Sequence, residues 1–376
     1  MPGTCTMPYQ ETWSARRKAR MTDKQIAYED VHEGMKLPSL EIGPWTVAHI
    51  VRWCAAQENW ERQHIDFKYA TEHEGLPDVV ANGNWRKHVM ARLFKDWAGR
   101  GGWLWKLFMR YSGMQFPGDV FHVGATVTGK REFDGCGFVE VRGGMRNQEG
   151  RETTPTTAVM VLPLRQGGEV PYPFVPPEGL NWESPFQRGV TCDDPKYVTD
   201  AVRAHIGRER EELESWDEVC RSELRRFSQA IPDPDPIYWD EEVGRRTRFG
   251  GIVAPPLFPV DAFRTPPYWP DRLTEKLKED PNFWGGPPGD ARFASSEREP
   301  LPLRTPISSA LNGGQDFEVF ELARLGEKLR VSSRLTDVYE KPSKTFGRIV
   351  IMESLSTYRN TEGRVILRMI GRGIRR

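Results

Sequence analysis

The sequence lacks the features of exported, membrane-spanning and disulfide-bonded proteins. It has no run of about 18 or more apolar residues, the length needed to cross a bilayer. Residues 1–20 include basic side chains but no apolar segment behind them, so no secretory signal is expected. The five cysteines are far apart, odd in number and without a C-x-x-C pair, which disfavours a disulfide framework or a thiolate metal site. The sequence therefore predicts a soluble cytoplasmic protein that does not associate with membranes.

The chain also lacks an excess of either charge. Lysine plus arginine and aspartate plus glutamate each number 53, giving a net charge of +0. Without an overall field to attract nucleic acid or anionic lipid, a small-molecule partner is favoured over nucleic acid. No phosphate-binding glycine motif follows a strand, and His64, His73 and His88 lack metal-ligand spacing. No cofactor and no metal are expected.

An internal repeat divides the chain into two halves. At 376 residues the chain is long enough for two domains or one large one. The polar turn RNQEG at 146–150 returns as RNTEG at 359–363, each time between two β-rich stretches. Aligning HID (64–66) with YWD (238–240) also brings LPDVVANG opposite GGIVAPPLF, offset by one residue. Two independent landmarks thus agree on the duplication.

Proline and glycine mark the boundaries between these units. Residues 165–189 are rich in both and predict a linker or a strap that covers a sheet. A similar stretch interrupts the second half and predicts an inserted loop, and long loops are often functional. The expected units are an N-terminal extension (1–27), a first domain (28–165), a linker (166–200) and a second domain (201–376) with an insertion (265–310).

Hydrophobic periodicity predicts both helices and antiparallel strands. Thr46 can cap a helix over 46–56, in which Val47, Ile50, Val51 and Cys54 form an apolar stripe. A second helix over 84–98 carries a broad apolar face that must be buried against a sheet. Strand-like alternation follows in both halves, at 120–133, 137–145, 328–340 and 348–358. The expected class is α+β.

These landmarks, taken in order, resemble those of the MaoC-like hot-dog acyl dehydratases, also called hydratase 2. The first half has a helix, an acidic turn ending in His64-x-Asp66, a Gly-Leu-Pro segment, a small-residue elbow before a buried helix, Pro-Gly-Asp at 117–119 and an Asn-Gln-x-Gly turn. The second half looks like the domain that usually forms the N-terminal half of double hot-dog members. The resemblance covers roughly 28–165 and 201–376, with the two halves in reversed order.

The resemblance implies both a fold and an activity. The fold would be a double hot-dog: two antiparallel sheets joined edge to edge, each wrapped on a central helix, the second and shorter helix starting near Pro256. The activity would be that of a hydro-lyase in fatty acid metabolism, an (R)-specific enoyl-thioester hydratase or 3-hydroxyacyl-thioester dehydratase. The substrate would be an acyl-CoA or an acyl carrier protein thioester. A homodimer or hetero-oligomer is expected.

The family's catalytic motif, D-x-N-P-x-H, is only partly present. Its histidine corresponds to His64, but the aspartate position five residues earlier is Asn59. In the second half the reverse holds, since Asp233 is present and Tyr238 replaces the histidine. Three interpretations follow: Glu61 or Glu58 replaces the lost base, His64 and Asp233 form a composite site, or the domain binds an acyl thioester without this chemistry. The third includes a catalytically silent subunit of a hetero-oligomeric dehydratase and a hot-dog thioesterase.

The site residues are assigned from this resemblance. His64 is the expected acid/base, Glu61 before Glu58 its partner, Asn59 the amide that orients water, and the Gly83 N–H the donor to the oxyanion. Asp66, which can also cap the next turn, is grouped with the substrate-binding residues. Basic side chains on the exposed face of the central helix (Arg86, Lys87 and Arg92), or Arg245, Arg246 and Arg248, would meet coenzyme A phosphates. The expected substrate-binding residues are Asp66, Asn82, Asn84, Arg86, Asp233 and Tyr238.

Overall fold

The structure is a computed structural model that describes residues 25–167, 169–286, 301–306, 311–344 and 346–376. Almost all of the expected N-terminal extension (1–27) lies outside the described residues, as does part of the expected insertion (265–310). The boundaries expected between domains stay predictions. No helix in the described part of the chain is long and apolar enough to cross a membrane.

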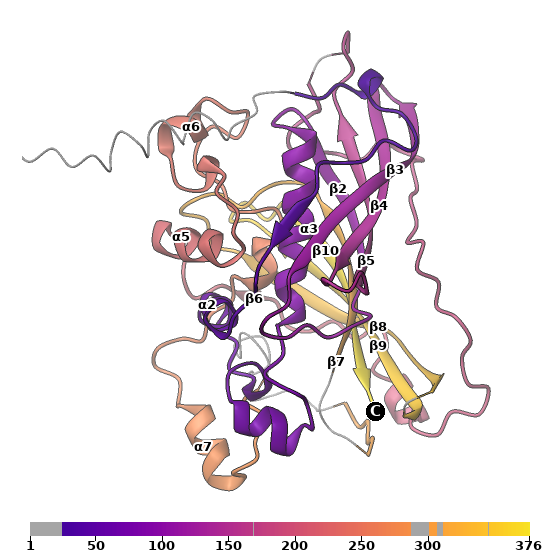
Figure 1. Cartoon of the computed structure of the whole chain (residues 1–376), viewed down its shortest axis with the longest axis vertical. Helices are drawn as coiled ribbons and strands as arrows, with labels where there is room; N and C mark the ends of the chain where they lie inside the picture. Colours follow the sequence, from indigo (N-terminus) through magenta and orange to yellow (C-terminus); the bar gives the residue numbers. More distant parts are fainter. Residues whose placement is uncertain (1–24, 168, 287–300, 307–310, 345) are drawn as a thin grey trace, which may run out of the picture.

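The core of the fold is one antiparallel sheet of ten strands, made of two sets of five joined edge to edge (Figure 1). The seam is the pairing of β2 with β7, where Leu107 lies opposite Phe317. The predicted edge-to-edge arrangement is therefore confirmed. The strand order is β1-β3-β4-β5-β2-β7-β10-β9-β8-β6. The strands are β1 (Leu40–Ile42), β2 (Trp103–Arg110), β3 (Phe121–Phe133), β4 (Cys136–Arg146), β5 (Glu152–Leu162), β6 (Leu213–Glu214), β7 (Leu311–Val319), β8 (Arg330–Ser343), β9 (Gly347–Arg359) and β10 (Val365–Arg375).

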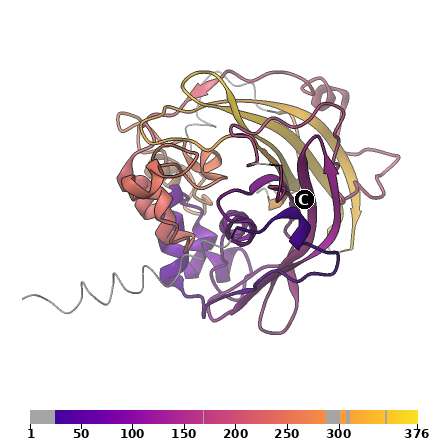
Figure 2. The ribbon, with the colours of Figure 1, turned by 90° about the horizontal axis from the view of Figure 1, so that it is seen from above.

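The sheet curves around one long helix, α3 (Gly83–Ala98), which lies inside the curve in Figure 2. The apolar face predicted for this helix is buried, including Trp85, Val89, Phe94 and Trp97. A helix buried on this scale is stabilised mainly by removing its apolar surface from water. The sequence located this central helix correctly to within one residue.

The described residues of the second half contain no matching long helix. The helix expected to start near Pro256 is instead the four-residue 3-10 helix η5 (Phe258–Asp261). Pro259 lacks a backbone N–H, and Pro266 and Pro267 follow closely, so the sequence cannot sustain several α-helical turns. The prediction of a second, shorter helix was right in position, but the element is a 3-10 helix.

The remaining helices lie mainly on the side of α3 away from the sheet (Figure 1). Helices α2 and α5 contact each other, and each leads into a short 3-10 turn. The short elements are η1 (Tyr28–Asp30), α2 (Val47–Gln57), η2 (Arg62–His64), η3 (Tyr69–His73), α4 (Asp200–Arg203), α5 (Arg221–Ala230), η4 (Pro236–Tyr238), α6 (Glu241–Arg245) and α7 (Arg272–Glu279).

The apolar stripe predicted for α2 was partly wrong. Val47 and Val51 are 43% and 45% exposed, whereas Ile50 and Cys54 are buried together with Trp53. The buried face is set by Trp53, whose ring packs 5.3 Å from the His88 ring of α3 and 5.4 Å from the Phe227 ring of α5. Tertiary packing on two sides thus rotates the buried face away from the first stripe.

The proline-rich linker runs along the outside of the sheet in an extended conformation (Figure 1). The described residues of 165–189 contain no helix or strand. Phe174 is buried with its ring 5.8 Å from that of Trp105, and its N–H donates to the Phe320 carbonyl at 2.8 Å. The linker therefore covers strand β2 near the seam.

Candidate active site

The turn after α2 is shaped by backbone and side-chain hydrogen bonds. Glu58 adopts a left-handed conformation (φ 54°, ψ 45°) that ends the helix. The Asn59 N–H donates to the Cys54 carbonyl at 2.9 Å, and the Asn59 Oδ1 accepts from the Glu61 N–H at 2.9 Å. This Asx turn leads directly into η2, whose last residue is His64.

His64 is held by the segment that leads into the central helix. Its side chain is buried, and its Nδ1 lies 2.7 Å from the Val80 carbonyl. Because a carbonyl oxygen can only accept, Nδ1 carries a hydrogen and Nε2 is left to exchange a proton. The Val80 N–H in turn donates to the Gln63 carbonyl at 3.1 Å. The imidazole is thus fixed in both orientation and tautomer.

Glu61 is the carboxylate within reach of His64. Its Oε2 lies 3.1 Å from His64 Nε2 and also accepts from Gln63 Nε2 at 2.9 Å. At this separation the imidazole and the carboxylate are within hydrogen-bond reach of each other. No hydrogen bond from a described residue reaches the Glu61 Oε1, which leaves it able to accept from water.

Asn59 carries a buried donor that has no partner among the described residues. The residue is fully buried, and its Nδ2 makes no hydrogen bond. The orientation of the amide is fixed because its oxygen accepts from the Glu61 N–H. A buried unpaired donor costs about 1–3 kcal/mol unless water or a ligand satisfies it. The amide is therefore suited to donate to a molecule bound beside Glu61.

The start of α3 supplies a backbone donor near the same turn. Asn82 caps the helix, with its Oδ1 accepting from the Asn84 N–H at 2.8 Å. The N–H of Gly83, the first helical residue, has no acceptor within the helix. Because Gly83 follows Val80 by three residues, the Cα atoms of these two residues are at most about 11 Å apart. The positive end of the helix dipole favours negative charge here.

The second half builds the same turn with different side chains. The Asp233 N–H donates to the Ser228 carbonyl at 3.0 Å, and Asp233 Oδ1 accepts from the Asp235 N–H at 3.2 Å. The 3-10 helix η4 follows and ends at Tyr238. Its Ile237 carbonyl accepts from the Val253 N–H at 3.2 Å, as the Gln63 carbonyl accepts from Val80. The repeat read from the sequence is therefore also a repeat of backbone geometry.

Cations from the first half neutralise this second turn. Lys95 Nζ, from α3, lies 2.8 Å from Asp235 Oδ2 and 3.6 Å from Asp233 Oδ1, and Arg100 lies 2.7 Å from Asp235 Oδ1. Burial acts to raise the pKa of Asp235, but Lys95 and Arg100 outweigh it and lower that pKa to about 2. The Tyr238 hydroxyl lies 3.2 Å from Asp233 Oδ2. These carboxylates are committed to ion pairs.

Known structures share this architecture. The chain is similar to a MaoC-like dehydratase (TM-score 0.54, 13% identity, covering 90% of this chain and 97% of that one). It is also similar to a MaoC domain protein from Chloroflexus aurantiacus (0.61, 14%, 94% and 98%). A conserved hypothetical protein from Mycobacterium tuberculosis, described as having a double hotdog fold, matches with a TM-score of 0.55 and 12% identity over 93% of this chain and 98% of that one. The chain has the double hot-dog fold.

Sequence comparisons find a dehydratase-region match and relatives over parts of the chain. Residues 204–369 match the family model described as FAS1-like, dehydratase domain region. The chain is 32% identical over 121 residues to a UPF0336 protein from Streptomyces avermitilis, covering 32% of this chain and 63% of that protein. A UPF0336 protein from Thermobifida fusca is 38% identical over 58 residues, covering 15% and 38%. The matches thus span less than two thirds of these relatives. The resemblance to MaoC-like dehydratases is confirmed, and the reversed order of the halves stays a prediction.

Several residues expected at the site of this double hot-dog protein have structural contacts instead. Asp66 accepts from the Tyr69 N–H at 3.0 Å and pairs with Arg62 at 2.8 Å, so it caps the following turn. Glu58 Oε2 accepts from the Thr265 N–H at 3.3 Å, and Glu58 makes no hydrogen bond with His64 among the described residues. The Asn84 Oδ1 accepts from Asn312 Nδ2 at 3.1 Å, which ties the start of α3 to β7. Their substrate-binding and catalytic roles stay predictions.

The placement expected for the basic residues of α3 was wrong. Arg86 and Lys87 are 3% and 0% exposed rather than facing solvent. Arg86 donates from NH1 to the Gly113 carbonyl at 2.8 Å, and Lys87 Nζ lies 3.0 Å from Asp261 Oδ2. Both cations are buried because the sheet and η5 enclose the helix on opposite sides, which periodicity alone did not reveal. Neither side chain is positioned on the surface to meet a phosphate.

The second basic cluster is divided between the surface and internal contacts. Arg245 pairs with Glu241 within α6 and Arg246 pairs with Glu242 at its C-terminal end, and both arginine side chains are exposed, so their expected contact with phosphates stays a prediction. Arg248 NH2 donates to the Gly102 carbonyl at 2.6 Å. These side chains stabilise local structure, and Arg92 likewise donates to the Pro232 carbonyl.

Asp261 joins the two halves beneath the site. It accepts from Gln57 Nε2 at 2.8 Å and from His88 Nε2 at 2.9 Å, in addition to its ion pair with Lys87. All four side chains are buried. Burial lowers the pKa of His88 to about 4, although Asp261 opposes this. His88 is therefore neutral at pH 7 and donates one hydrogen bond across the interface between the halves.

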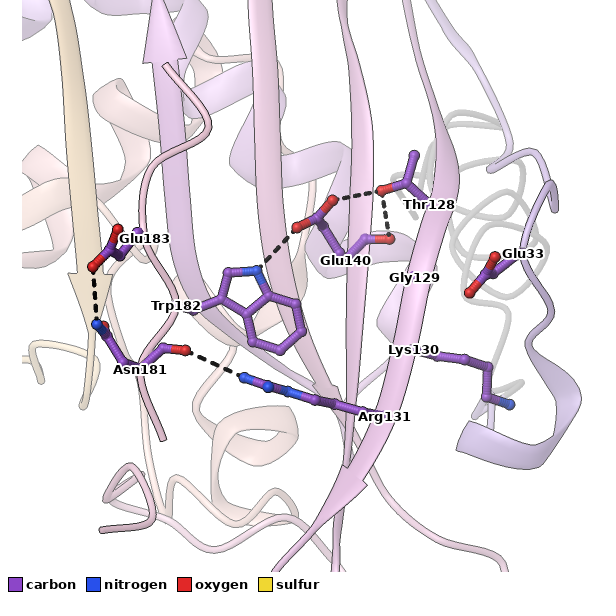
Figure 3. A pocket seen from close by; sticks show the side chains of 9 residues that line it. All are labelled: Glu33, Thr128, Gly129, Lys130, Arg131, Glu140, Asn181, Trp182 and Glu183. Atoms are coloured by element: carbon purple, nitrogen blue, oxygen red, sulfur yellow. Dashed lines mark hydrogen bonds between the residues drawn. The ribbon is translucent and has the colours of Figure 1, made fainter. Parts of the chain in front are cut away.

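A separate polar groove lies where the linker crosses β3 and β4 (Figure 3). It has a volume of about 430 Å³. Its side chains bond to one another: Trp182 Nε1 donates to Glu140 Oε2 at 3.0 Å, Thr128 Oγ1 to Glu140 Oε1 at 2.8 Å, and Arg131 to the Asn181 carbonyl at 3.3 Å. The groove is formed by β3, β4 and the linker, away from the turn that carries His64, and its lining residues include no His–Glu pair.

Sequence reasoning missed the groups that hold the turn in place. These are the Val80 carbonyl on His64, the Gln63 amide on Glu61, and the backbone of Pro281–Gly285 that packs on residues 60–62. A backbone acceptor leaves no trace in residue type. The glycine- and proline-rich insertion was the one available signal for the third group.

Proposed function

We propose that this chain is a hydro-lyase, an (R)-specific enoyl-thioester hydratase or 3-hydroxyacyl-thioester dehydratase that acts on an acyl-CoA or an acyl carrier protein thioester. The observation that carries the proposal is the His64–Glu61 pair, 3.1 Å apart, on the same turn as the unpaired Asn59 amide. The double hot-dog fold and the dehydratase-region match support the reaction class. The acyl group is left open.

The pair can act as both base and acid in hydration. With His64 protonated and Glu61 ionised, Glu61 removes a proton from water as the water oxygen bonds to C3 of the enoyl group. The electron pair of the C2–C3 double bond moves toward the thioester oxygen. His64 Nε2 then gives its proton to C2 and becomes neutral. Glu61 returns its proton to His64 directly, because their polar atoms are 3.1 Å apart.

Two donors assist these steps. The Asn59 Nδ2 donates to the attacking water and aligns its lone pair toward C3. The Gly83 N–H meets the negative charge that develops on the thioester oxygen, where one such donor contributes a factor of about 100–1,000 in rate. Dehydration is the same sequence reversed, with loss of the 3-hydroxyl as water. These roles require no group beyond the chain's own residues.

The test is a direct assay of the purified chain with crotonyl-CoA and with a bulky enoyl-CoA. Loss of the enoyl absorbance without release of free thiol is the expected result. Release of thiol would assign a thioesterase instead. Absence of both reactions, with retained acyl-CoA binding, would assign the silent acyl-binding subunit, for which the asparagine at position 59 is the supporting observation.

A further inference from the structure

The segment Pro281–Gly286, here called the strap, lies directly on the turn that carries Glu61. The strap follows α7 in the insertion of the second half. The Arg62 N–H donates to the Trp284 carbonyl at 2.9 Å. The second half of the chain therefore reaches across and contacts the candidate active site of the first half.

Arg62 fastens the strap with its side chain as well. Its NH1 donates to the Pro281 carbonyl at 2.8 Å and lies 3.4 Å from that of Phe283. Its Nε and NH2 bond to Asp66 Oδ2 at 3.0 and 2.8 Å, and its guanidinium lies 4.4 Å from the centre of the Tyr69 ring. Asp66 and Tyr69 thus orient the guanidinium, and the strap takes the remaining donors.

Gly285 fits the strap against the turn on the other side of Glu61. Its φ is +102°, and an added Cβ would overlap the Trp60 carbonyl and lie 3.0 Å from the Glu61 Cα. A side chain is disfavoured there by both backbone conformation and contact. The backbone of Glu61 is consequently enclosed, by Gly285 at residue 60 and by the Trp284 carbonyl at residue 62.

We infer that the strap and Arg62 position the Glu61 carboxylate for catalysis. Glutamate has one more side-chain torsion than the aspartate that the family motif places at position 59. Glu61 therefore needs its backbone fixed to keep its carboxylate near His64. The strap supplies that constraint. Arg62 is a positioning residue because it acts through Glu61 and the strap. This inference rests on the proposed function for its catalytic consequence, but its structural part does not.

Gly285→Ala is the direct test, with Gly286→Ala as the matched control. Gly286 has a similar φ of +84°, but an added Cβ would meet only the Phe283 ring, at 3.6 Å, among the described residues. Both variants strain the strap backbone, and only the first displaces the turn. Gly285→Ala should lower kcat about 10- to 100-fold, the scale of a misplaced catalytic group. KM for a short enoyl-CoA should change little.

Arg62→Met tests the contribution of the Arg62 side chain to the contact with the strap. Its control is Arg52→Met, at an exposed position of α2. Arg62→Met should lower kcat as Gly285→Ala does, and added guanidinium ion should restore part of the loss. An equal loss of kcat in both arginine variants, or in both glycine variants, would overturn the inference.

The imidazole NMR resonances of His64 provide a readout that does not depend on turnover. Glu61→Gln sets the reference change, and Gly285→Ala and Arg62→Met should shift the resonances in the same direction, whereas Gly286→Ala and Arg52→Met should not. If these shifts occur in a protein that shows no hydratase activity, the positioning role stands and the proposed function fails. If the protein is active and neither kcat nor the resonances respond, the positioning role is excluded.

Discussion

The two halves build the same turn and use it for opposite purposes. In each, an Asx turn and a 3-10 helix place a carboxylate two positions and a ring five positions after the Asx residue. In the first half, Glu61 faces His64, and no lysine or arginine of the described residues pairs with it. In the second, Asp235 is paired with Lys95 and Arg100. The comparison teaches that backbone geometry supplies the frame, whereas neighbouring charges decide whether a carboxylate is available for chemistry.

Removing His64 should have the largest effect on the turn of the first half. His64→Ala should lower turnover by a factor of about 100 or more, the scale of general acid/base catalysis, with a small change in Tm. Enoyl-CoA assays and thermal unfolding measure the two effects. The exposed His122→Ala is the matched control and should leave both unchanged. A large fall in Tm with activity retained would assign His64 a structural role.

Removing the Gly83 N–H should have the next largest effect. Proline is tolerated at the first helical position, and Asn82 already has the extended conformation (φ −64°, ψ 128°) that precedes a proline. Gly83→Pro should lower kcat about 100-fold, because it removes one donor to the thioester oxygen. Gly83→Ala keeps the donor, and its Cβ would sit 3.8 Å from the Tyr111 ring, an ordinary contact. Similar activity in both variants would contradict the oxyanion role.

The second half should respond in stability rather than in activity. Asp235→Asn leaves Lys95 and Arg100 without their carboxylate, and we expect a loss of about 2–3 kcal/mol in the free energy of unfolding, less than for a fully buried pair because both cations are partly exposed. Glu61→Gln at the equivalent position should instead lower kcat with little change in unfolding free energy. Denaturant titrations of both variants decide the matter. An equal loss of unfolding free energy in Asp235→Asn and Glu61→Gln would show that the two turns do not differ in this way.

The buried contact between the halves predicts a pH dependence of stability. His88 has a pKa near 4 in the folded protein and an ordinary value of 6.5, so unfolding binds a proton as the pH falls. Its contribution is present above pH 6.5 and is lost as the pH falls from 6.5 towards 4, by about 2–3 kcal/mol. His88→Gln keeps a donor for Asp261 without titrating and should flatten this part of the profile. An unchanged profile would show that other groups dominate it.

The smallest effect is expected from restoring the family residue. Asn59→Asp keeps the oxygen that accepts from the Glu61 N–H but adds a second carboxylate beside Glu61. Because like charges repel and raise one pKa, kcat should be unchanged or fall by a few-fold. A clear rise in kcat would show that Glu61 does not serve as the base.

Local patterns in the sequence predicted much of the frame. The apolar face of 84–98, the alternating strands and the repeated RNQEG and RNTEG turns each depend on nearby residues, and all lie where they were expected. The second Asn-containing turn repeats the first, since Asn147 and Asn360 each accept from the N–H groups two and four residues later. The second, shorter helix expected near Pro256 is a 3-10 helix, because the prolines of this segment interrupt α-helical hydrogen bonding.

The candidate site was only partly predictable. The sequence named His64 and ranked Glu61 before Glu58, and the structure shows which carboxylate contacts the imidazole. It misplaced Arg86 and Lys87, because a cation on a helix reads as exposed unless its buried partner is known. That partner, Asp261, is 174 positions away from Lys87 in the chain.

The sequence by itself determined the helix and strand pattern, the duplication and the identity of the polar residues on each turn, because periodicity and turn chemistry act over a few residues. The double hot-dog frame was implied by its resemblance to a known family. Only the tertiary structure decided which turn keeps its carboxylate available. That choice depends on Lys95 and Arg100 reaching Asp235, and on the strap reaching Arg62, across 135–222 positions of chain. Charge pairing and desolvation act through space between groups brought together by folding, so no local pattern encodes them.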